Sequence, residues 1–319
     1  MVPTARPSLS AVVPVYNSAG TLEDLVRRLE PVLRAEANDF ELILVDDGSR
    51  DASASKIADL ARRHAWIVAV PLMRNFGQHN ALLCGLRRAR CELIVTLDDD
   101  LQNPPEEIPR LLEALADEVD VVYGTPAKEQ HGLLRDLASQ ITKLALQNAM
   151  GAKVARKVSP FRVFRRHLTE AFAAYKSPFV SIDVLLTWGT TRFSAVEVRH
   201  EPRTVGQSNY TFKALSTHAM NMMTGFSTFP LQMASLTGFA FTLLGMGLLV
   251  YVLARTLLEG SPVQGFPFLA SMIALFSGAQ LFALGILGEY LARMHSRSMD
   301  RPPYAVRPDP VPPDSERPS

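Results

Sequence analysis

The chain has 319 residues, with 33 Lys and Arg against 32 Asp and Glu and a net charge of +1. So balanced a composition gives no overall attraction to nucleic acid, which would need a concentrated basic surface. The two cysteines, Cys84 and Cys91, belong to no CxxC pair or Cys/His cluster, so we expect reduced core thiols rather than a zinc site or a disulfide framework.

The first half of the chain alternates short apolar segments with helical patterns. The expected strands are apolar on both sides, as in a covered parallel sheet, and lie at 9–15, 40–45, 67–72, 92–97 and 119–123. The expected helices lie at 21–36, 51–65, 77–90 and 104–118. Thr21 and Asp24 are spaced like a capping box at the start of the first helix. This alternation predicts an α/β fold with a doubly wound, mostly parallel sheet.

Polar residues follow four of the expected strands. The motifs are "PVYN" at 14–17, "VDDGS" at 45–49, "LMRNFGQH" at 72–79 and "LDDDLQ" at 97–102. Open α/β sheets bind ligands beyond the carboxyl ends of their strands. We therefore expect these motifs to meet around one ligand.

The "LDDDLQ" motif places three carboxylates side by side. On an extended segment Asp98 and Asp100 would point the same way and Asp99 the opposite way. Two hard-oxygen ligands, completed by water or a substrate diphosphate, suit Mg²⁺ or Mn²⁺. The alternative is a solvent-facing acidic cluster at a helix start. The acidic turn at Asp46 and Asp47, after a neighbouring strand, favours the metal site.

The later part of the chain contains two long stretches without a charged residue, 219–254 and 260–288. Each exceeds the roughly 20 apolar residues that cross a hydrocarbon core. We expect a two-helix transmembrane hairpin at about 229–254 and 264–290; the alternative is two buried helices of a soluble domain. Basic residues before and after the hairpin place both termini in the cytosol.

Two segments beside the expected hairpin, 133–150 and 210–226, have apolar residues at helical spacing. They fit interfacial helices or ordinary amphipathic packing. The expected organisation is a cytosolic domain at 1–210, an amphipathic interfacial helix at 211–228 and two spans within 229–292. A basic, then Pro-rich cytosolic tail follows at 293–319, and its Pro-rich part after Arg301 is expected to be disordered. The start of the chain has no apolar segment long enough for a signal peptide.

Common nucleotide-binding motifs are absent from the sequence. No G-x-x-x-x-G-K-[ST] occurs, which excludes a P-loop enzyme, and no G-x-G-x-x-G follows the first strand, which argues against hydride transfer on a dinucleotide. The ligand of the strand ends is therefore of another kind.

The ordered motifs resemble the family-two glycosyltransferases of the GT-A fold, and within them the bacterial polyisoprenyl-phosphate glycosyltransferases. That group includes transferases of 4-deoxy-4-formamidoarabinose, glucose and mannose to undecaprenyl or dolichyl phosphate. The motifs are "VVPVYN", "ILVDDGS", "MRNFGQHNALLCGL", "LDDDLQNPPEEIPRLL", "FRVFRR", "RTVGQSNYTFKAL" and "GEYLARM". The likeness runs from about Ser10 to Arg301 and includes both apolar stretches.

The resemblance implies roles for the polar motifs. The residues implied in holding the nucleotide-sugar, most often a uridine one, are Pro14, Tyr16, Asn17, Asp46, Asp47, Arg74, Gly77, His79 and Asp99. Asp98 and Asp100 would bind the metal, and Gln102 would lie beside the sugar. The residues implied in contacting phosphate or covering the site are Ser159, Arg162, Arg203, Ser208 and Tyr210. The implied catalytic set is Asp98, Asp100, Gln102, Arg162 and Arg203.

The implied reaction is the inverting transfer of one sugar from a nucleotide-sugar, UDP-linked or GDP-linked, to the phosphate of a membrane polyprenyl phosphate. The product would be a lipid-linked monosaccharide for cell-envelope glycan or lipid A modification, made at the cytosolic face of a bacterial inner membrane. The acceptor phosphate, with a second pKa near ~6, is largely dianionic at neutral pH and needs little help from a general base. We therefore assign none. Gly278, Gly285 and Gly288 permit close helix contacts, so a homo-oligomer is allowed.

One segment departs from the family pattern. Several relatives carry an acidic residue before the "FR" pair, where this chain has Ser159 and Pro160, and Arg156 and Lys157 make the segment more basic. The group that contacts the acceptor phosphate, and the sugar that fits, therefore stay open. His79 is equally compatible with a capped surface histidine.

Two other functions are compatible with parts of the sequence. A processive polysaccharide synthase shares the aspartates, but it would carry a Q-x-x-R-W segment, which is absent here. A non-catalytic membrane scaffold with a degenerate transferase domain would not need the intact "DDGS" and "LDDD" motifs. We therefore favour the single-sugar transferase.

Overall fold

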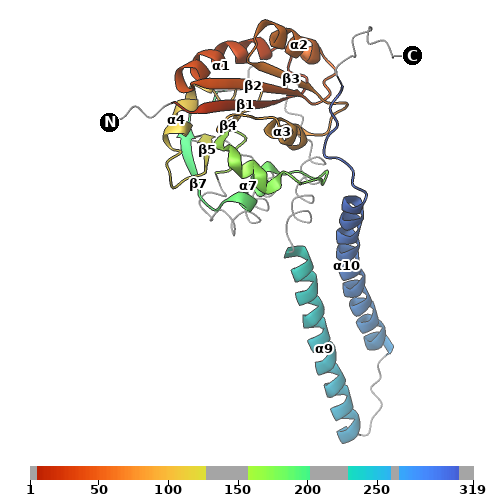
Figure 1. The fold of residues 1–319 in the computed structure, drawn as a ribbon. Helices are drawn as coiled ribbons and strands as arrows, with labels where there is room; N and C mark the ends of the chain where they lie inside the picture. Colours follow the sequence, from red (N-terminus) through yellow and green to blue (C-terminus); the bar gives the residue numbers. More distant parts are fainter. Residues whose placement is uncertain (1–5, 127–156, 202–228, 260–265, 309–319) are drawn as a thin grey trace, which may run out of the picture. The chain divides into compact units, whose positions relative to one another are not determined.

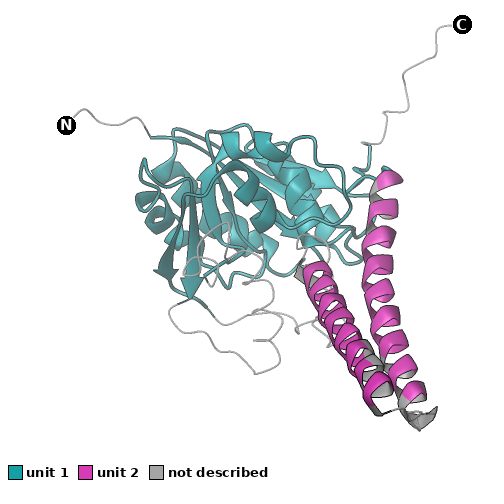
Figure 2. Ribbon diagram, turned by 90° about the horizontal axis from the view of Figure 1, so that it is seen from below, with its two compact units in different colours: residues 1–211, 300–319 teal, residues 212–299 magenta. Residues whose placement is uncertain are grey.

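In the computed structural model of the chain, the structure describes residues 6–126, 157–201, 229–259 and 266–308. These residues fall into two compact units, one formed by 1–211 and 300–319 and the other by 212–299 (Figure 2). The segments expected as interfacial helices, 133–150 and 211–228, lie outside the described residues.

The first unit is built on a seven-stranded sheet with the order β3-β2-β1-β4-β6-β5-β7. The strands are β1 (Ser8–Val15), β2 (Asp39–Asp46), β3 (Ile67–Pro71), β4 (Leu93–Thr96), β5 (Val121–Pro126), β6 (Arg162–Arg165) and β7 (Phe193–Val198). Neighbouring strands are parallel except where β6 pairs antiparallel with β4 and β5. The five expected strands and the mostly parallel α/β sheet are confirmed.

The strands β6 and β7 are not among those expected from the sequence. β6 has four residues, two of them arginine, so no apolar run marks it. It runs antiparallel between β4 and β5, which makes the sheet mixed.

Helices cover both faces of the sheet. They are α1 (Leu22–Glu36), α2 (Ser53–Arg63), α3 (Gln78–Leu86), α4 (Ile108–Glu113) and α7 (Ile182–Gly189), with 3₁₀ turns η1 (Pro105–Glu107) and η2 (Arg166–Phe172). Figure 1 shows α1 and α2 over one face and α3 and α7 over the other. The helix expected at 104–118 begins as η1 and ends at Glu113.

The alternation of side chains along β1 produces two cores. Ala11 and Val13 are buried in the core that includes Leu25 of α1, whereas Val12 is buried in the other core with Leu83 of α3. A strand that buries both faces reads as a continuous apolar run, and this is why the parallel strands were visible in the sequence.

The capping box expected at the start of α1 does not form. Thr21 has helical dihedral angles, and its hydroxyl donates to the Ser18 carbonyl at 3.1 Å instead of capping α1. The Asp24 carboxylate pairs with Arg27 one turn further along. Thr21 and Asp24 have the spacing of a capping box, but the Thr21 hydroxyl is used in the turn that precedes α1.

Both cysteines are buried and free, as expected. Burial raises the pKa of the Cys84 thiol to about 11 and that of Cys91 in the same direction. Both thiols are therefore protonated at neutral pH and act as small apolar side chains.

Part of the tail that was expected to be disordered is ordered against the first unit. Met73 donates its backbone N–H to the Ala305 carbonyl at 2.9 Å, and Arg307 donates to the Pro71 carbonyl at 2.8 Å. The side chains of Tyr304 and Val306, two residues apart, pack on the core around α3. An apolar residue at every second position allows a short extended segment to cover the open edge of β3, which composition alone does not reveal.

The second unit contains two long helices, α9 (Phe229–Glu259) and α10 (Phe266–Ser298), which lie side by side in both views (Figures 1 and 2). The rings of Phe241 and Phe276 meet edge to face with centroids 5.8 Å apart. Among the described residues, one stretch, Leu231–Leu248, is long and apolar enough to cross a membrane. The apolar part of α10, Phe276–Ala292, is shorter. Within the described residues, the structure thus gives one apolar stretch of spanning length and one shorter stretch, where two spans were expected at about 229–254 and 264–290.

Candidate functional site

The acidic turn after β2 is buried and tightly packed. Asp46 and Asp47 are each 3% exposed, and an Asp46 carboxylate oxygen accepts the backbone N–H of Ser49 at 3.1 Å. Gly48 has a φ of +69°, and a Cβ at this position would lie 2.5 Å from the carbonyl carbon of Arg74. Only glycine allows the β3–α3 loop, residues 74–77, to approach this turn so closely.

The Asp47 carboxylate joins the acidic turn to that loop. Its two oxygens accept the backbone N–H groups of Phe76 at 2.7 Å and Gly77 at 2.8 Å. Burial raises the pKa of Asp47 to about 6, and the two hydrogen bonds oppose the shift without cancelling it. Asp47 therefore holds the main chain of Phe76 and Gly77, and Gly77 is one of the residues implied in donor binding.

The end of β1 meets both acidic segments. The side-chain oxygen of Asn17 accepts the N–H of Arg50 at 2.8 Å, and the N–H of Asn17 donates to the Ser49 hydroxyl at 3.0 Å. The N–H of Tyr16 donates to Asp99 at 3.3 Å. Asn17 has a φ of 55°, an uncommon conformation that is often found where a chain is held for function. The ends of β1, β2 and β4 are thus brought together, as the sequence predicted.

The triple aspartate lies in a turn and not on an extended strand. β4 ends at Thr96, and Leu101 has a φ of 61°, so the side-chain alternation expected for Asp98, Asp99 and Asp100 does not apply. The reason is that the chain leaves the sheet before the aspartates begin.

Each aspartate of the turn has a different neighbour. Asp98 accepts from the Gln78 side chain at 2.6 Å, and Asp100 accepts the N–H of Gln102 at 3.1 Å. Burial raises the pKa of Asp99, and the adjacent Asp100 carboxylate adds to the shift. Asp99 is tied to β1, whereas Asp98 and Asp100 lie on either side of it.

Asp98 and Asp100 fit a divalent cation only with additional ligands. In the part of the chain that the structure describes, no group of three or more His, Cys, Asp or Glu side chains could hold a metal ion. Two carboxylates supply the hard oxygens that Mg²⁺ and Mn²⁺ prefer, and such ions often take their other ligands from water and a substrate diphosphate. The donor set therefore fits a metal that arrives with its substrate.

Arg162 is placed differently from the expectation. It is 1% exposed, and its guanidinium forms an ion pair with Asp183 of α7 and donates to the Thr96 hydroxyl at 3.0 Å. An arginine enclosed in this way has no surface for a phosphate group. A phosphate contact was expected for Arg162, whereas in the structure its guanidinium contacts Asp183 and Thr96 and thereby supports the end of β4.

Asp183, which the sequence analysis missed, is the centre of this buried network. It also accepts from the Tyr123 hydroxyl at 3.1 Å, and the Thr96 hydroxyl donates to the Pro160 carbonyl at 2.6 Å. Burial raises the pKa of Tyr123, so that this hydroxyl stays protonated as a donor. The signal available in the sequence was a single aspartate inside the apolar run "FVSIDVLL".

A second missed residue, Arg28 of α1, connects two loops. Its guanidinium contacts Glu106 at 2.8 Å and Glu201 at 3.1 Å, and the carboxylates raise its pKa. The backbone N–H of Glu201 donates to the Gln102 carbonyl at 2.9 Å. Arg28 and Gln102 thus hold the start of the segment that leads to Arg203. Nothing in an ordinary amphipathic helix pattern distinguishes Arg28.

The remaining expected residues fall into two groups. Among the described ones, His79 accepts the N–H of Ile182 at 3.4 Å, and Ser159 accepts the N–H of Phe161 at 3.2 Å. The Arg74 guanidinium lies over the Phe76 ring, 4.3 Å from its centroid. Pro14 is buried in β1. Arg203, Ser208 and Tyr210 lie outside the described residues.

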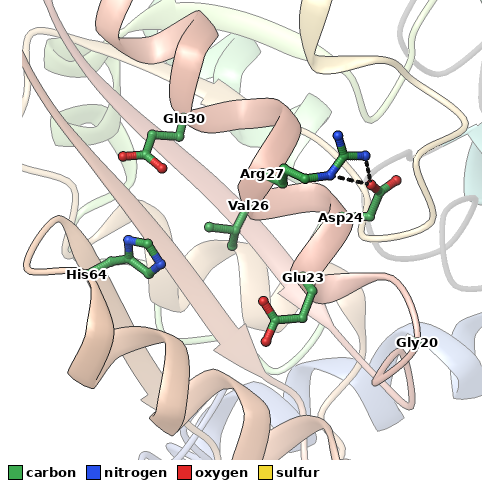
Figure 3. Close-up of a pocket in the computed structure, with 7 residues that line it drawn as sticks. All are labelled: Gly20, Glu23, Asp24, Val26, Arg27, Glu30 and His64. Atoms are coloured by element: carbon green, nitrogen blue, oxygen red, sulfur yellow. Dashed lines mark hydrogen bonds and ion pairs between the residues drawn. The ribbon is translucent and has the colours of Figure 1, made fainter.

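A hollow on another part of the first unit contains none of the expected residues. It is lined by Gly20, Glu23, Asp24, Val26, Arg27, Glu30 and His64 (Figure 3). Figure 3 shows Arg27 paired with Asp24 and the other acidic side chains on the same helix. We assign the site to the strand ends, where the turns meet, and not to this hollow.

Comparison with known proteins identifies the family. The model of Glycosyl transferase family 2 matches residues 10–172. The chain is 37% identical over 301 residues to the undecaprenyl-phosphate 4-deoxy-4-formamido-L-arabinose transferase of Pseudomonas aeruginosa (strain LESB58), with 93% of this chain and 89% of the relative covered. The chain belongs to glycosyltransferase family 2. The transferase of the same name from Enterobacter sp. (strain 638) is 35% identical to this glycosyltransferase over 302 residues, covering 94% and 92% of the two chains.

Solved structures show the same fold for the glycosyltransferase. Glucosyl-3-phosphoglycerate synthase from Mycobacterium tuberculosis, in complex with phosphoglyceric acid, matches with a TM-score of 0.52 and 20% identity over 68% of this chain and 78% of that one. The same enzyme in complex with Mn²⁺, uridine diphosphate and glucosyl-3-phosphoglycerate matches with a TM-score of 0.51 and 20% identity, over the same shares of the two chains. The expected GT-A type of α/β fold is thereby confirmed.

The buried pair gives a stability prediction. Replacing Arg162 with Met leaves the Asp183 carboxylate buried without its cation, so we expect the free energy of unfolding to fall by about 3–5 kcal/mol. Denaturant unfolding in detergent measures the loss. Arg166→Met, at an exposed arginine of the same segment, is the control and should cost less than about 0.5 kcal/mol. Equal losses in both variants would contradict the assignment of Arg162 to a buried supporting network.

Proposed function

We propose that this glycosyltransferase transfers one sugar from a UDP-sugar to the phosphate of undecaprenyl phosphate, with inversion at the anomeric carbon. The observation that supports it most is the identity of 37% over 93% of the chain to relatives named as undecaprenyl-phosphate transferases, since that match includes the apolar C-terminal region as well as the α/β unit. Their name also makes 4-deoxy-4-formamido-L-arabinose the first sugar to test. The product would be a lipid-linked monosaccharide for modifying lipid A or another envelope glycan.

The donor would lie where the ends of β1, β2 and β4 meet. Tyr16, Asn17 and the loop held by Asp47 would enclose the nucleoside. The other residues implied in nucleotide-sugar binding would lie around the diphosphate. The neighbouring Asp46 and Asp99 carboxylates are occupied by backbone N–H groups, so their part is to fix the turns. Preformed turns reduce the ordering that substrate binding requires.

The diphosphate would be held at Asp98 and Asp100 together with a divalent cation. When bound, Mg²⁺ or Mn²⁺ supplies positive charge that stabilises the departing nucleoside diphosphate. Gln102, fixed between Asp100 and Glu201, would lie next to the sugar.

The acceptor itself would act as the nucleophile. An oxygen of its phosphate forms the new bond to the anomeric carbon, and the bond from that carbon to the donor diphosphate breaks, with the electron pair leaving on UDP. A phosphate monoester with a second pKa near ~6 is already mostly dianionic at neutral pH, so no side chain has to remove a proton. With Arg162 buried, Arg203 is the arginine that we propose for phosphate contact, with Ser208 and Tyr210 covering the site.

The second unit would provide the membrane anchor. Leu236, Phe239, Leu243 and Val250 on α9 are all more than half exposed, and Leu281, Phe282 and Leu291 on α10 are as well. A long helix that exposes apolar side chains on several faces is stable in lipid and not in water. We propose that α9 and α10 form the hairpin expected from the sequence, in the bacterial inner membrane, with both termini in the cytosol.

The test is turnover with a panel of donors. Purified protein in detergent or nanodiscs is incubated with Mg²⁺ or Mn²⁺, undecaprenyl phosphate and labelled UDP- and GDP-sugars, and lipid products are separated by chromatography. We expect one lipid-linked monosaccharide from a UDP-sugar. A long polymer would instead indicate a processive synthase, and no product from any donor would indicate a scaffold.

Asp100→Asn tests the metal ligand. Because the amide removes one of two negative charges at the proposed cation site, we expect kcat/KM to fall at least about a hundredfold, with the melting temperature unchanged within a few degrees. Asp59→Asn, on the exposed side of α2, is the control and should retain full activity. Near-normal turnover of Asp100→Asn would remove Asp100 from the proposed set.

Asp47 gives a prediction about pH. Its pKa of about 6 is above the ordinary value, so the folded protein protonates Asp47 as the pH falls through about 6, while an exposed aspartate remains charged. Protonation weakens its hold on the N–H groups of Phe76 and Gly77. We therefore expect the Kd for a UDP-sugar, measured without acceptor, to rise between pH 7 and pH 5. The diphosphate of a UDP-sugar does not itself titrate in this range.

The matched variant for the pH prediction is Asp47→Asn, which has no charge to lose. It should bind the UDP-sugar more weakly at pH 7 and show no such pH dependence, whereas a parallel rise of Kd in both proteins would assign the effect to another group.

The raised pKa of Asp47 also predicts how stability depends on pH. The folded state binds the proton more tightly than the unfolded state does, so Asp47 lowers the free energy of unfolding as the pH rises from about 4 to about 6.

A further inference from the structure

The segment after the second long helix forms an extra strand on the sheet. We define the tail strand as residues 304–307. It makes an antiparallel bridge between Val306 and Leu72, and two backbone hydrogen bonds flank the bridge, from Met73 to Ala305 and from Arg307 to Pro71. Since β3 is the last strand at its side of the sheet, the tail strand occupies an edge that would otherwise present unpaired groups.

Side chains fix the tail strand in place. Tyr304 and Val306 pack against the core beneath α3. The Arg87 guanidinium, at the end of α3, lies 5.8 Å from the Tyr304 ring centroid, and its Nη1 is 3.5 Å from the Tyr304 hydroxyl. Arg87 also donates to the Ala173 carbonyl at 3.0 Å. The segment is therefore held by main-chain pairing, apolar burial and an arginine contact together.

The tail strand pairs with the residues that lead directly into the donor loop. The N–H of Leu72 donates to the Asp46 carbonyl at 2.9 Å, so this part of the chain lies between the acidic turn on one side and the tail strand on the other. Arg74 follows immediately, and the loop then reaches the two N–H groups that Asp47 accepts. The loop is held by Asp47 at its far end and by the tail strand at its near end.

The tail strand follows closely after α10 in the sequence. α10 ends at Ser298, and the tail strand begins only a few residues later at Tyr304. An edge strand contributed from near the end of the chain thus connects a long apolar helix, through a short link, to the loop at the donor site.

We propose that the tail strand is a positioning element for donor binding: by pairing with residues 71–73 it holds the β3–α3 loop in the conformation that receives the nucleotide. This inference rests on the proposed function for the identity of the ligand, and on the backbone contacts for the placement. Tyr304 and Val306 touch neither substrate nor reacting atoms and act through the loop.

Two truncations of the full-length protein test the proposal. A chain that ends at Pro308 keeps the tail strand, and a chain that ends at Asp300 lacks it. We expect the first to match the intact protein. In the second, the KM for the UDP-sugar should rise about five- to tenfold, the effect of losing roughly one net hydrogen bond's stabilisation of the bound loop. The KM for undecaprenyl phosphate and kcat at saturating donor should stay within about twofold of the intact values.

Point variants make the same comparison without shortening the chain. Arg307→Pro removes the N–H that donates to Pro71, and Tyr304→Ala removes the contact with Arg87. Both should raise the donor KM in the same direction as the truncation. Arg301→Ala, an exposed residue before the tail strand, is the matched control and should leave all three constants unchanged.

Hydrogen exchange at the loop separates the failure of this inference from the failure of the proposed function. The amides of Phe76 and Gly77 should exchange several-fold faster in the chain that ends at Asp300, whatever the substrate is. Unchanged exchange there, or a lowered melting temperature with an unchanged donor KM, would overturn the positioning role. If no UDP-sugar is used even by the intact protein, the proposed function fails, and the exchange rates alone decide whether the tail strand holds the loop.

Discussion

The hydrogen bonds from the β3–α3 loop to the Asp47 carboxylate are the interaction on which the rest of the proposed site depends. A buried anion is costly unless hydrogen bonds compensate it, and here two consecutive backbone N–H groups of the β3–α3 loop supply that compensation. The same contact fixes a loop that has no regular structure of its own. Gly48 makes the contact possible because any side chain there would collide with Arg74. The proposed donor site is therefore formed by two turns that this contact holds together.

A second constraint comes from the antiparallel strand β6. It places Arg162 between β4 and α7, where the guanidinium can reach both Thr96 and Asp183. Buried ion pairs contribute little net stability but strongly disfavour arrangements that separate the charges. The network thus fixes the end of β4, two residues before the triple aspartate, in one position. The turn that contains the three aspartates therefore starts from a fixed position.

Sequence patterns predicted those parts of the fold that periodicity controls. The parallel strands bury both faces and stand out as apolar runs, and their carboxyl ends carry the polar residues that the structure brings together. Periodicity fails where pairing is decided over long distances: β6 is short and half charged, and the tail strand is recognisable only beside the edge of β3. The buried pair of Arg162 and Asp183 was not foreseen for the same reason, because a sequence motif does not show that a charged residue has a buried partner from another element. The alternation of the three aspartates was wrong because one turn begins after Thr96, and no composition marks that point.

The burial of both cysteines has a practical consequence for labelling this protein with a fluorophore. A maleimide reacts with thiolates, and both native thiols are enclosed and have raised pKa values, that of Cys84 reaching about 11. The chain contains no other cysteine. A single cysteine introduced at an exposed position of the tail or of the donor loop would therefore be the dominant site of fluorophore attachment, without any need to delete the native pair.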